Sequence, residues 1–84
     1  MMLVTYDTEV GATYLKLADA VVARTVSVSD LVMVDLGARD EEIGVEFAVL
    51  PSKITVVMLD RLAERFPHLK SLRDTDAWLL TAPH

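Results

Sequence analysis

The sequence lacks the residues that build covalent and thiolate cross-links. Its 84 residues include no cysteine and only two histidines, His68 and His84. Disulfides and thiolate metal sites are therefore excluded, and two histidines are too few for a histidine-rich metal site. The absence of cysteine fits a reducing compartment, so we expect a cytoplasmic protein. We expect no cofactor.

Basic residues and long apolar runs are also scarce. The chain has 8 Lys and Arg against 13 Asp and Glu, and residues 1–52 alone carry a net charge of −6, against +1 for residues 53–84. A nucleic-acid interface needs a basic stripe, so we expect no nucleic-acid partner. No apolar run approaches the roughly 20 residues of a membrane helix, so we expect no membrane partner. The start, Met1 to Val4, has no basic residue of the kind that opens a signal peptide.

Apolar side chains, by contrast, are abundant for a chain of this size. Hydrophobic residues make up 52% of the sequence and the mean hydropathy is +0.37. A domain this small buries only about 60–65% of the surface its unfolded chain exposes, so part of the apolar excess stays at the surface. Such a surface is typical of an interface. We therefore expect a homodimer.

The first two-thirds of the chain alternates between apolar and polar residues, as strands do. The alternating segments are 13–17, 22–28, 32–36 and 43–49, and residues 3–6 are rich in β-prone residues. Short turns join them, which predicts antiparallel hairpins. In the turn after residue 36 we expect Gly37 to adopt a positive φ. Asp35 and Glu46 are expected on the mixed face of the sheet, near Lys16.

Helical spacing replaces the alternation after Pro51. Leu59, Leu62 and Phe66 lie at i, i+3 and i+7, with Thr55 as a candidate N-cap and Ser52 as a competitor. Pro67 is expected to end this helix, and a second helix is expected between residues 69 and 80. The prediction is one α+β domain over residues 1–84: an antiparallel β-meander of four to five strands (1–50), covered on one face by one or two C-terminal helices (54–82).

The C-terminal segment also supplies the candidate dimer interface. Its apolar residues give an imperfect stripe, and the tryptophan lies off that stripe. The candidate interface residues are Leu72, Trp78, Leu79 and Leu80. A sheet edge remains the alternative contact for the second copy.

The strand segments carry a pattern of their own. The motifs are Thr5-Tyr6-Asp7-x-Glu9, Ala12-x-Tyr14-Leu15-Lys16-Leu17, Thr25-Val26-x-Val28, Val32-x-Val34-Asp35-Leu36 and Ile43-Gly44-Val45-Glu46-Phe47. In this order and spacing, over residues 3–49, the chain resembles the domain of unknown function 2283 family. It departs at Gly11, where the family often has an acid, and at Thr13, where it usually has an aliphatic residue. The resemblance implies a small antiparallel sheet packed on a helix, implies no reaction, and includes relatives that look like partners of small toxin-like proteins.

Acidic residues are the remaining candidates for a site. The candidate acidic surface is Asp35, Asp40, Glu41, Glu42 and Glu46. Paired carboxylates can share a proton or bind a hard cation, but a solvated sheet face and a solvated loop tip are the simpler interpretations. His68 follows a proline at a helix end and lacks a base role. No catalytic or metal-binding residue is predicted.

Three functions follow in order of preference. The first is a non-enzymatic protein–protein interaction module that self-associates. The second is an antitoxin-like partner that uses the acidic residues to neutralise a small basic toxin protein. The third, and the weakest, is a small metal-binding or hydrolytic protein.

Overall fold

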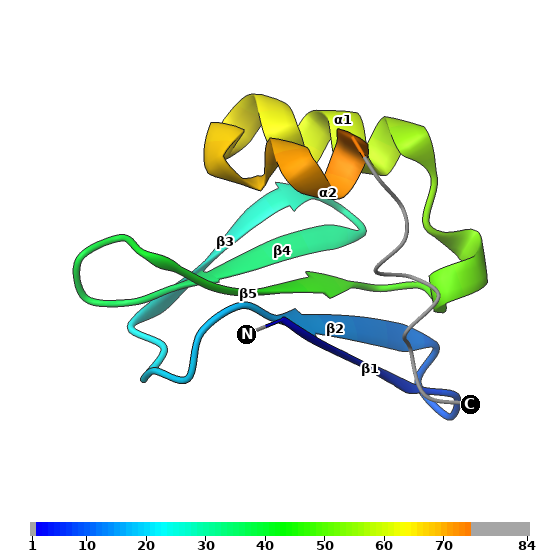
Figure 1. The fold of residues 1–84 in the computed structure, drawn as a ribbon. Coiled ribbons are helices and arrows are strands. Elements are labelled where there is room, and N and C mark those ends of the chain that lie inside the picture. The colour runs from blue at the N-terminus through cyan, green and yellow to red at the C-terminus, as the bar shows by residue number, and fades with distance from the viewer. Residues whose placement is uncertain (1, 75–84) are drawn as a thin grey trace.

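The computed structural model describes residues 2–74 and consists of a twisted antiparallel sheet under a helical layer (Figure 1). The predicted α+β class, with one face of the sheet covered by C-terminal helices, is confirmed. The strands are β1 (Leu3–Asp7), β2 (Ala12–Lys16), β3 (Arg24–Ser29), β4 (Val32–Leu36) and β5 (Glu42–Phe47). The helices are η1 (Pro51–Lys53), α1 (Val56–Arg65), η2 (Pro67–Leu69) and α2 (Lys70–Asp74).

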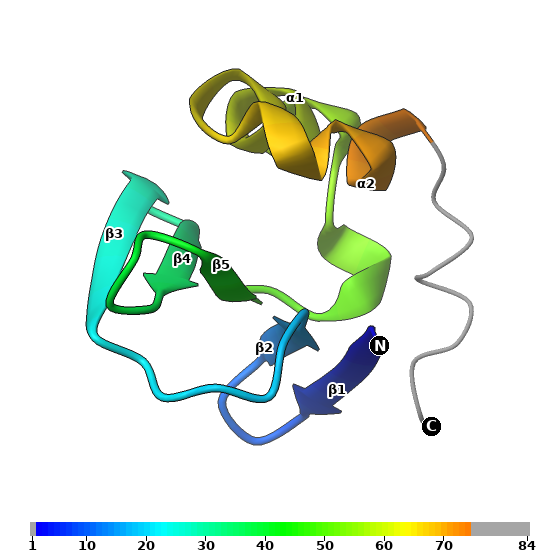
Figure 2. The ribbon, with the colours of Figure 1, turned by 60° about the vertical axis from the view of Figure 1, so that its left-hand side comes forward.

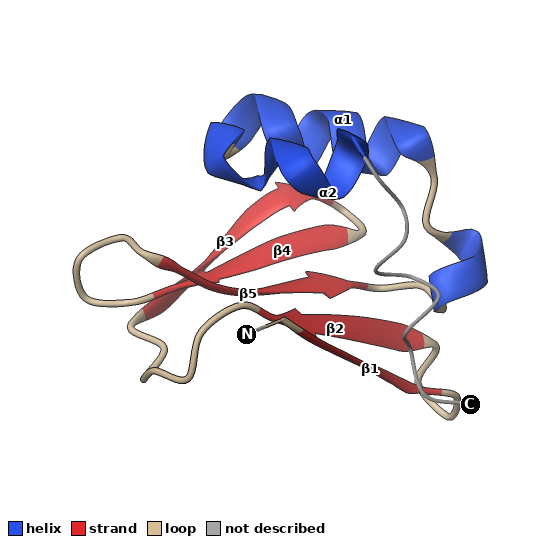
Figure 3. Cartoon of the chain, in the orientation of Figure 1, coloured by secondary structure: helices blue, strands red, loops and turns tan. Residues whose placement is uncertain are grey.

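The spatial order of the strands is β1-β2-β5-β4-β3. The hairpin β1–β2 and the meander β3–β4–β5 are each continuous in sequence, and β2 joins them by pairing with β5. The connection between β2 and β3, residues 17–23, therefore runs from one half of the sheet to the far edge (Figure 3). The sequence predicted a strand from residue 22, but Val21 and Val22 belong to this connection and are 88% and 43% exposed.

The apolar face is built from cross-strand rows that alternate with polar rows. One row aligns Val4, Leu15, Val45 and Val34 across β1, β2, β5 and β4, and all four side chains are at most 3% exposed. Paired residues in neighbouring strands lie on the same side of the sheet, so this row forms the sheet's side of the hydrophobic core. In the central strand β5, Val45 and Phe47 are both fully buried.

Helix α1 packs its apolar side chains against this row of the sheet. Leu59 and Leu62 are 5% and 0% exposed, and Figures 1 and 2 show α1 and α2 together on one side of the sheet. The predicted cap is confirmed, because the Thr55 Oγ1 accepts a hydrogen bond from the Met58 N–H at 3.3 Å. The predicted stop at Pro67 is also confirmed, since α1 ends at Arg65 and Pro67 begins η2. The part of the second predicted helix beyond Asp74 lies outside the described residues.

One turn differs from its prediction. Asp40, with φ 63°, adopts the left-handed conformation in the β4–β5 turn, while Gly37 does not. Aspartate tolerates this conformation better than most residues with a side chain. Gly37 has a different role: a Cβ at this position would overlap the carboxylate of Glu41, which folds back over the turn. A larger residue at this position would have to displace this flexible, exposed carboxylate.

We expect Leu62→Ala to lower the free energy of unfolding by about 2–5 kcal/mol, because it leaves a cavity between α1 and the sheet. Val57→Ala is the matched control on the same helix, since Val57 is 60% exposed. Urea denaturation followed by circular dichroism measures both. Equal losses for the two variants would contradict the placement of α1.

Candidate functional site

The sheet has a second face that the helices of residues 51–74 leave uncovered, and we call it the open face. Successive side chains of a strand point to opposite faces of a sheet, so the two cross-strand rows that alternate with the core rows lie on this face. The first row is Leu3, Lys16, Gly44, Asp35 and Thr25, and the second is Thr5, Tyr14, Glu46, Met33 and Ser27. Asp35 and Glu46 therefore share this face on neighbouring strands, as predicted. Lys16 also lies on it, but its ammonium pairs with Asp19 at 2.9 Å.

A hydrogen-bonded triad spans the centre of the open face. Asp35 accepts one hydrogen bond from the Tyr14 hydroxyl at 2.8 Å and another from the Thr25 hydroxyl at 2.6 Å. The donors come from β2 and β3, so the carboxylate on β4 links three strands of the sheet. Hydrogen bonds to an ionised acceptor are stronger than neutral ones. The triad therefore holds these three strands together by hydrogen bonds on the face opposite the core.

Gly44 leaves the space that the triad needs. β5 lies between β2 and β4, so the Tyr14 side chain must cross it to reach Asp35. A Cβ at Gly44 would overlap the Tyr14 hydroxyl and the ring carbon that bears it. A glycine inside a strand often marks such a close approach. Gly44 was the one signal in the sequence for the triad; the roles of Tyr14 and Thr25 were not predicted.

The electrostatics of the open face favour a neutral phenol. Burial, the hydrogen bond to Asp35 and the negative charges of Asp35 and Glu46 raise the pKa of Tyr14 to about 12. Tyr14 is therefore a hydrogen-bond donor near neutral pH and is unsuited to proton transfer there. Glu46 is half-buried and makes no hydrogen bond or ion pair with the described residues. The open face thus presents negative charge with little internal compensation.

A shallow groove adjoins this charge at the turn end of the β1–β2 hairpin. It has a volume of about 250 Å³. Its lining includes Thr5, Asp7, Val10, Tyr14 and Glu46. Asp7 is partly engaged, since its Oδ1 accepts the Glu9 N–H at 2.9 Å and shapes the turn. The groove therefore combines apolar walls with two carboxylates.

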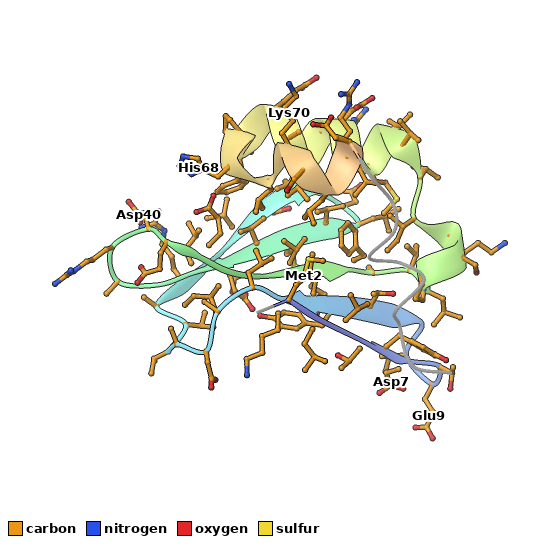
Figure 4. The ribbon with its side chains drawn as sticks, viewed as in Figure 1. Met2, Asp7, Glu9, Asp40, His68 and Lys70 are labelled. Atoms are coloured by element: carbon orange, nitrogen blue, oxygen red, sulfur yellow. The ribbon has the colours of Figure 1, made fainter. Side chains whose placement is uncertain are left out.

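The remaining predicted acids lie at another end of the molecule, in and next to the β4–β5 turn. Asp40 pairs with Arg24 at 2.6 Å, and Figure 4 shows Asp40 and His68 at the same end. Hydrogen bonds from its own N–H and from the Arg39 N–H lower the pKa of Glu41. Glu42 lies 3.5 Å from the His68 ring. Each of these carboxylates has a local partner, so they shape the turn and its contact with η2.

The predicted acidic residues therefore form two groups. Asp35 and Glu46 lie on the open face, whereas Asp40, Glu41 and Glu42 cluster around the β4–β5 turn. The sequence treated them as one acidic surface. The division follows from the length of the strands, because the turn lies beyond the last open-face row of the sheet.

The predicted interface residues also divide. Leu72 is 4% exposed and belongs to the core of its own chain, so its assignment to an interface is corrected. It is buried because η2 turns the chain back and brings α2 against α1. Trp78, Leu79 and Leu80 lie outside the described residues.

Comparisons with known proteins yield no relative. No family model, curated protein or solved structure matches the chain. Among residues 2–74, no group of three or more His, Asp or Glu side chains is placed to hold a metal ion. Within the same residues, no helix is long and apolar enough to cross a bilayer.

We expect Tyr14→Phe to lower the free energy of unfolding by about 1 kcal/mol, because Asp35 loses a donor while the ring remains. Tyr6→Phe is the matched control, since the Tyr6 hydroxyl has no hydrogen bond in the described part of the chain. Thermal or urea denaturation measures the difference. A loss at Tyr6 as large as that at Tyr14 would count against the triad.

Titration of Tyr14 gives a second expectation, on pH dependence. The pKa of Tyr14 is raised to about 12 in the folded chain, above the value of about 10 for an unfolded tyrosine. Its contribution to stability is therefore complete below pH 10 and is lost as the pH rises toward 12. The difference in ultraviolet absorbance between wild type and Tyr14→Phe isolates this ionisation. A midpoint near 10 would contradict the geometry of the triad.

Proposed function

We propose that this protein is a non-enzymatic interaction module of the cytoplasm that self-associates as a homodimer. The observation that carries the proposal is the β1 edge at one end of the sheet, with which no strand of residues 2–74 pairs. An edge strand presents a row of free N–H and C=O groups that favours pairing with another chain. Binding to a second copy also stabilises a domain whose own core is small.

Exposed apolar side chains support the same proposal. Met2 and Leu3 are 44% and 54% exposed at the start of β1. Val56 and Val57 are 66% and 60% exposed in the first turn of α1. Single exposed apolar residues are common on monomers, but three such pairs among residues 2–74, counting Val21 and Val22, fit an interface.

The chemistry of the open face supports a role without catalysis. Its phenol is held neutral by burial and by the carboxylates around it, and the groove beside it is an open depression. Acid–base catalysis needs a group that titrates near the working pH in a sheltered pocket. The resemblance to the domain of unknown function 2283 family stays a prediction. Because that family implies no reaction, the resemblance also favours a role without catalysis.

Multi-angle light scattering tests self-association directly. We expect a mass of about twice 9.3 kDa at high micromolar concentration, falling toward 9.3 kDa on dilution. A mass of 9.3 kDa throughout the concentration series would remove the proposal.

A second candidate function is antitoxin-like binding of a small basic protein, and the groove favours it. The Glu46 carboxylate there has no partner among the described residues, and its charge adds to the rise in the pKa of Tyr14. A cationic side chain from a partner would relieve this uncompensated charge. Co-purification of a basic protein, lost on Glu46→Gln but retained on Glu64→Gln, would support this function. Glu64 is an exposed acid on α1, away from the groove.

A further inference from the structure

Two strands, β1 and β3, have an unpaired edge in the described sheet. The outward backbone groups of β1 can be assigned from one hydrogen bond between the chain just past β2 and β5. The Leu17 N–H donates to the Ile43 carbonyl at 2.8 Å, so Leu17 directs its backbone groups toward β5. These directions alternate along an antiparallel strand. Tyr14 and Lys16 therefore direct theirs toward β1.

The same alternation fixes the outer edge of β1. Tyr14 faces Thr5 and Lys16 faces Leu3, so Thr5 and Leu3 use their N–H and C=O groups to bind β2. The groups of Val4 and Tyr6 point the other way, to the side where no described strand pairs with them. The free edge of β1 therefore offers two donors and two acceptors at regular spacing.

The β1 edge is regular, whereas the β3 edge is not. The register of β1 with β2 is unbroken over all five residues of the strand. The register of β3 shifts between Ser27 and Ser29, and the Ser27 hydroxyl donates to the Ser29 carbonyl at 2.9 Å. Bulges twist an edge and are a common protection against pairing. Of the two edges, β1 is the one left open to a further strand.

We propose that two copies of this chain pair antiparallel along β1, about a two-fold axis through Thr5, to form one continuous sheet. This inference rests on the proposed self-association and names the surface that it uses. The register is set by symmetry: with Thr5 opposite Thr5 of the second copy, Val4 of each chain faces Tyr6 of the other. All outward groups of Val4 and Tyr6 are then paired, giving four hydrogen bonds.

The side chains agree with this register. Val4 and Tyr6 both lie on the core side of β1, so their contact extends the apolar layer from one copy to the other. On the open face the two Thr5 side chains meet, and β-branched cross-strand pairs are favourable. Each Asp7 lies opposite Leu3 of the other copy, at opposite ends of the junction, so the two aspartates do not oppose each other.

A single cysteine tests the axis, because the natural chain has none. In the proposed dimer Thr5 forms a non-hydrogen-bonded pair with its copy, with Cα atoms about 4.5 Å apart, within the range of a disulfide. We expect full-length Thr5→Cys to cross-link under mild oxidation roughly a hundredfold faster than freely colliding chains. Ser27→Cys is the matched control, since Ser27 is exposed in the same open-face row at the other edge.

The outcomes separate this inference from the proposed function. Fast cross-linking of Thr5→Cys, with Ser27→Cys remaining slow, supports the β1 junction. A dimeric mass with equal cross-linking of the two variants overturns the junction and leaves self-association standing. In that case a full-length Trp78→Asp variant that becomes monomeric would assign the contact to the C-terminal segment. A monomeric wild type overturns both.

Discussion

The structure depends on the burial of one apolar face of a sheet that cannot bury it alone. The row from Val4 through Leu15 and Val45 to Val34 would face water without α1, and Leu62 closes the other side of that layer. Burial of apolar side chains is the main favourable term in a chain without disulfides. Both the position of α1 and the strand register follow from it, because a shift of one residue would turn the row toward solvent.

The sequence contained enough information for the layers but not for the order of the strands. Alternation at residues 13–17 and 43–49 and helical spacing from Leu59 predicted the two faces correctly, because periodicity reports which side of an element is buried. It does not report which strands are neighbours. The pairing of β2 with β5 joins segments far apart in the chain, and no local signal in residues 17–23 distinguishes a turn from a crossing connection.

The sequence predicted which acidic residues share the open face, but it did not predict the hydrogen bonds that they make. Asp35 and Glu46 were correctly placed on the mixed face, since strand parity determines it. The triad needed a further fact, that Tyr14 reaches across Gly44 to a strand that is not adjacent to its own. Leu72 could not be assigned from the sequence, because an apolar residue fits a core and an interface equally well. The turn at η2 places it in the core.

The position of β5 has a consequence for how the chain folds. The central strand is the last of the described strands along the chain, so a nascent chain that has emerged only through β4 can form two hairpins but cannot join them. Bringing residues 44–47 beside residues 13–16 closes a long loop, which costs entropy before the new contacts form. Until that step both sides of the incomplete sheet are unpaired edges, and the time spent in this state is the period in which newly made chains are most prone to aggregate.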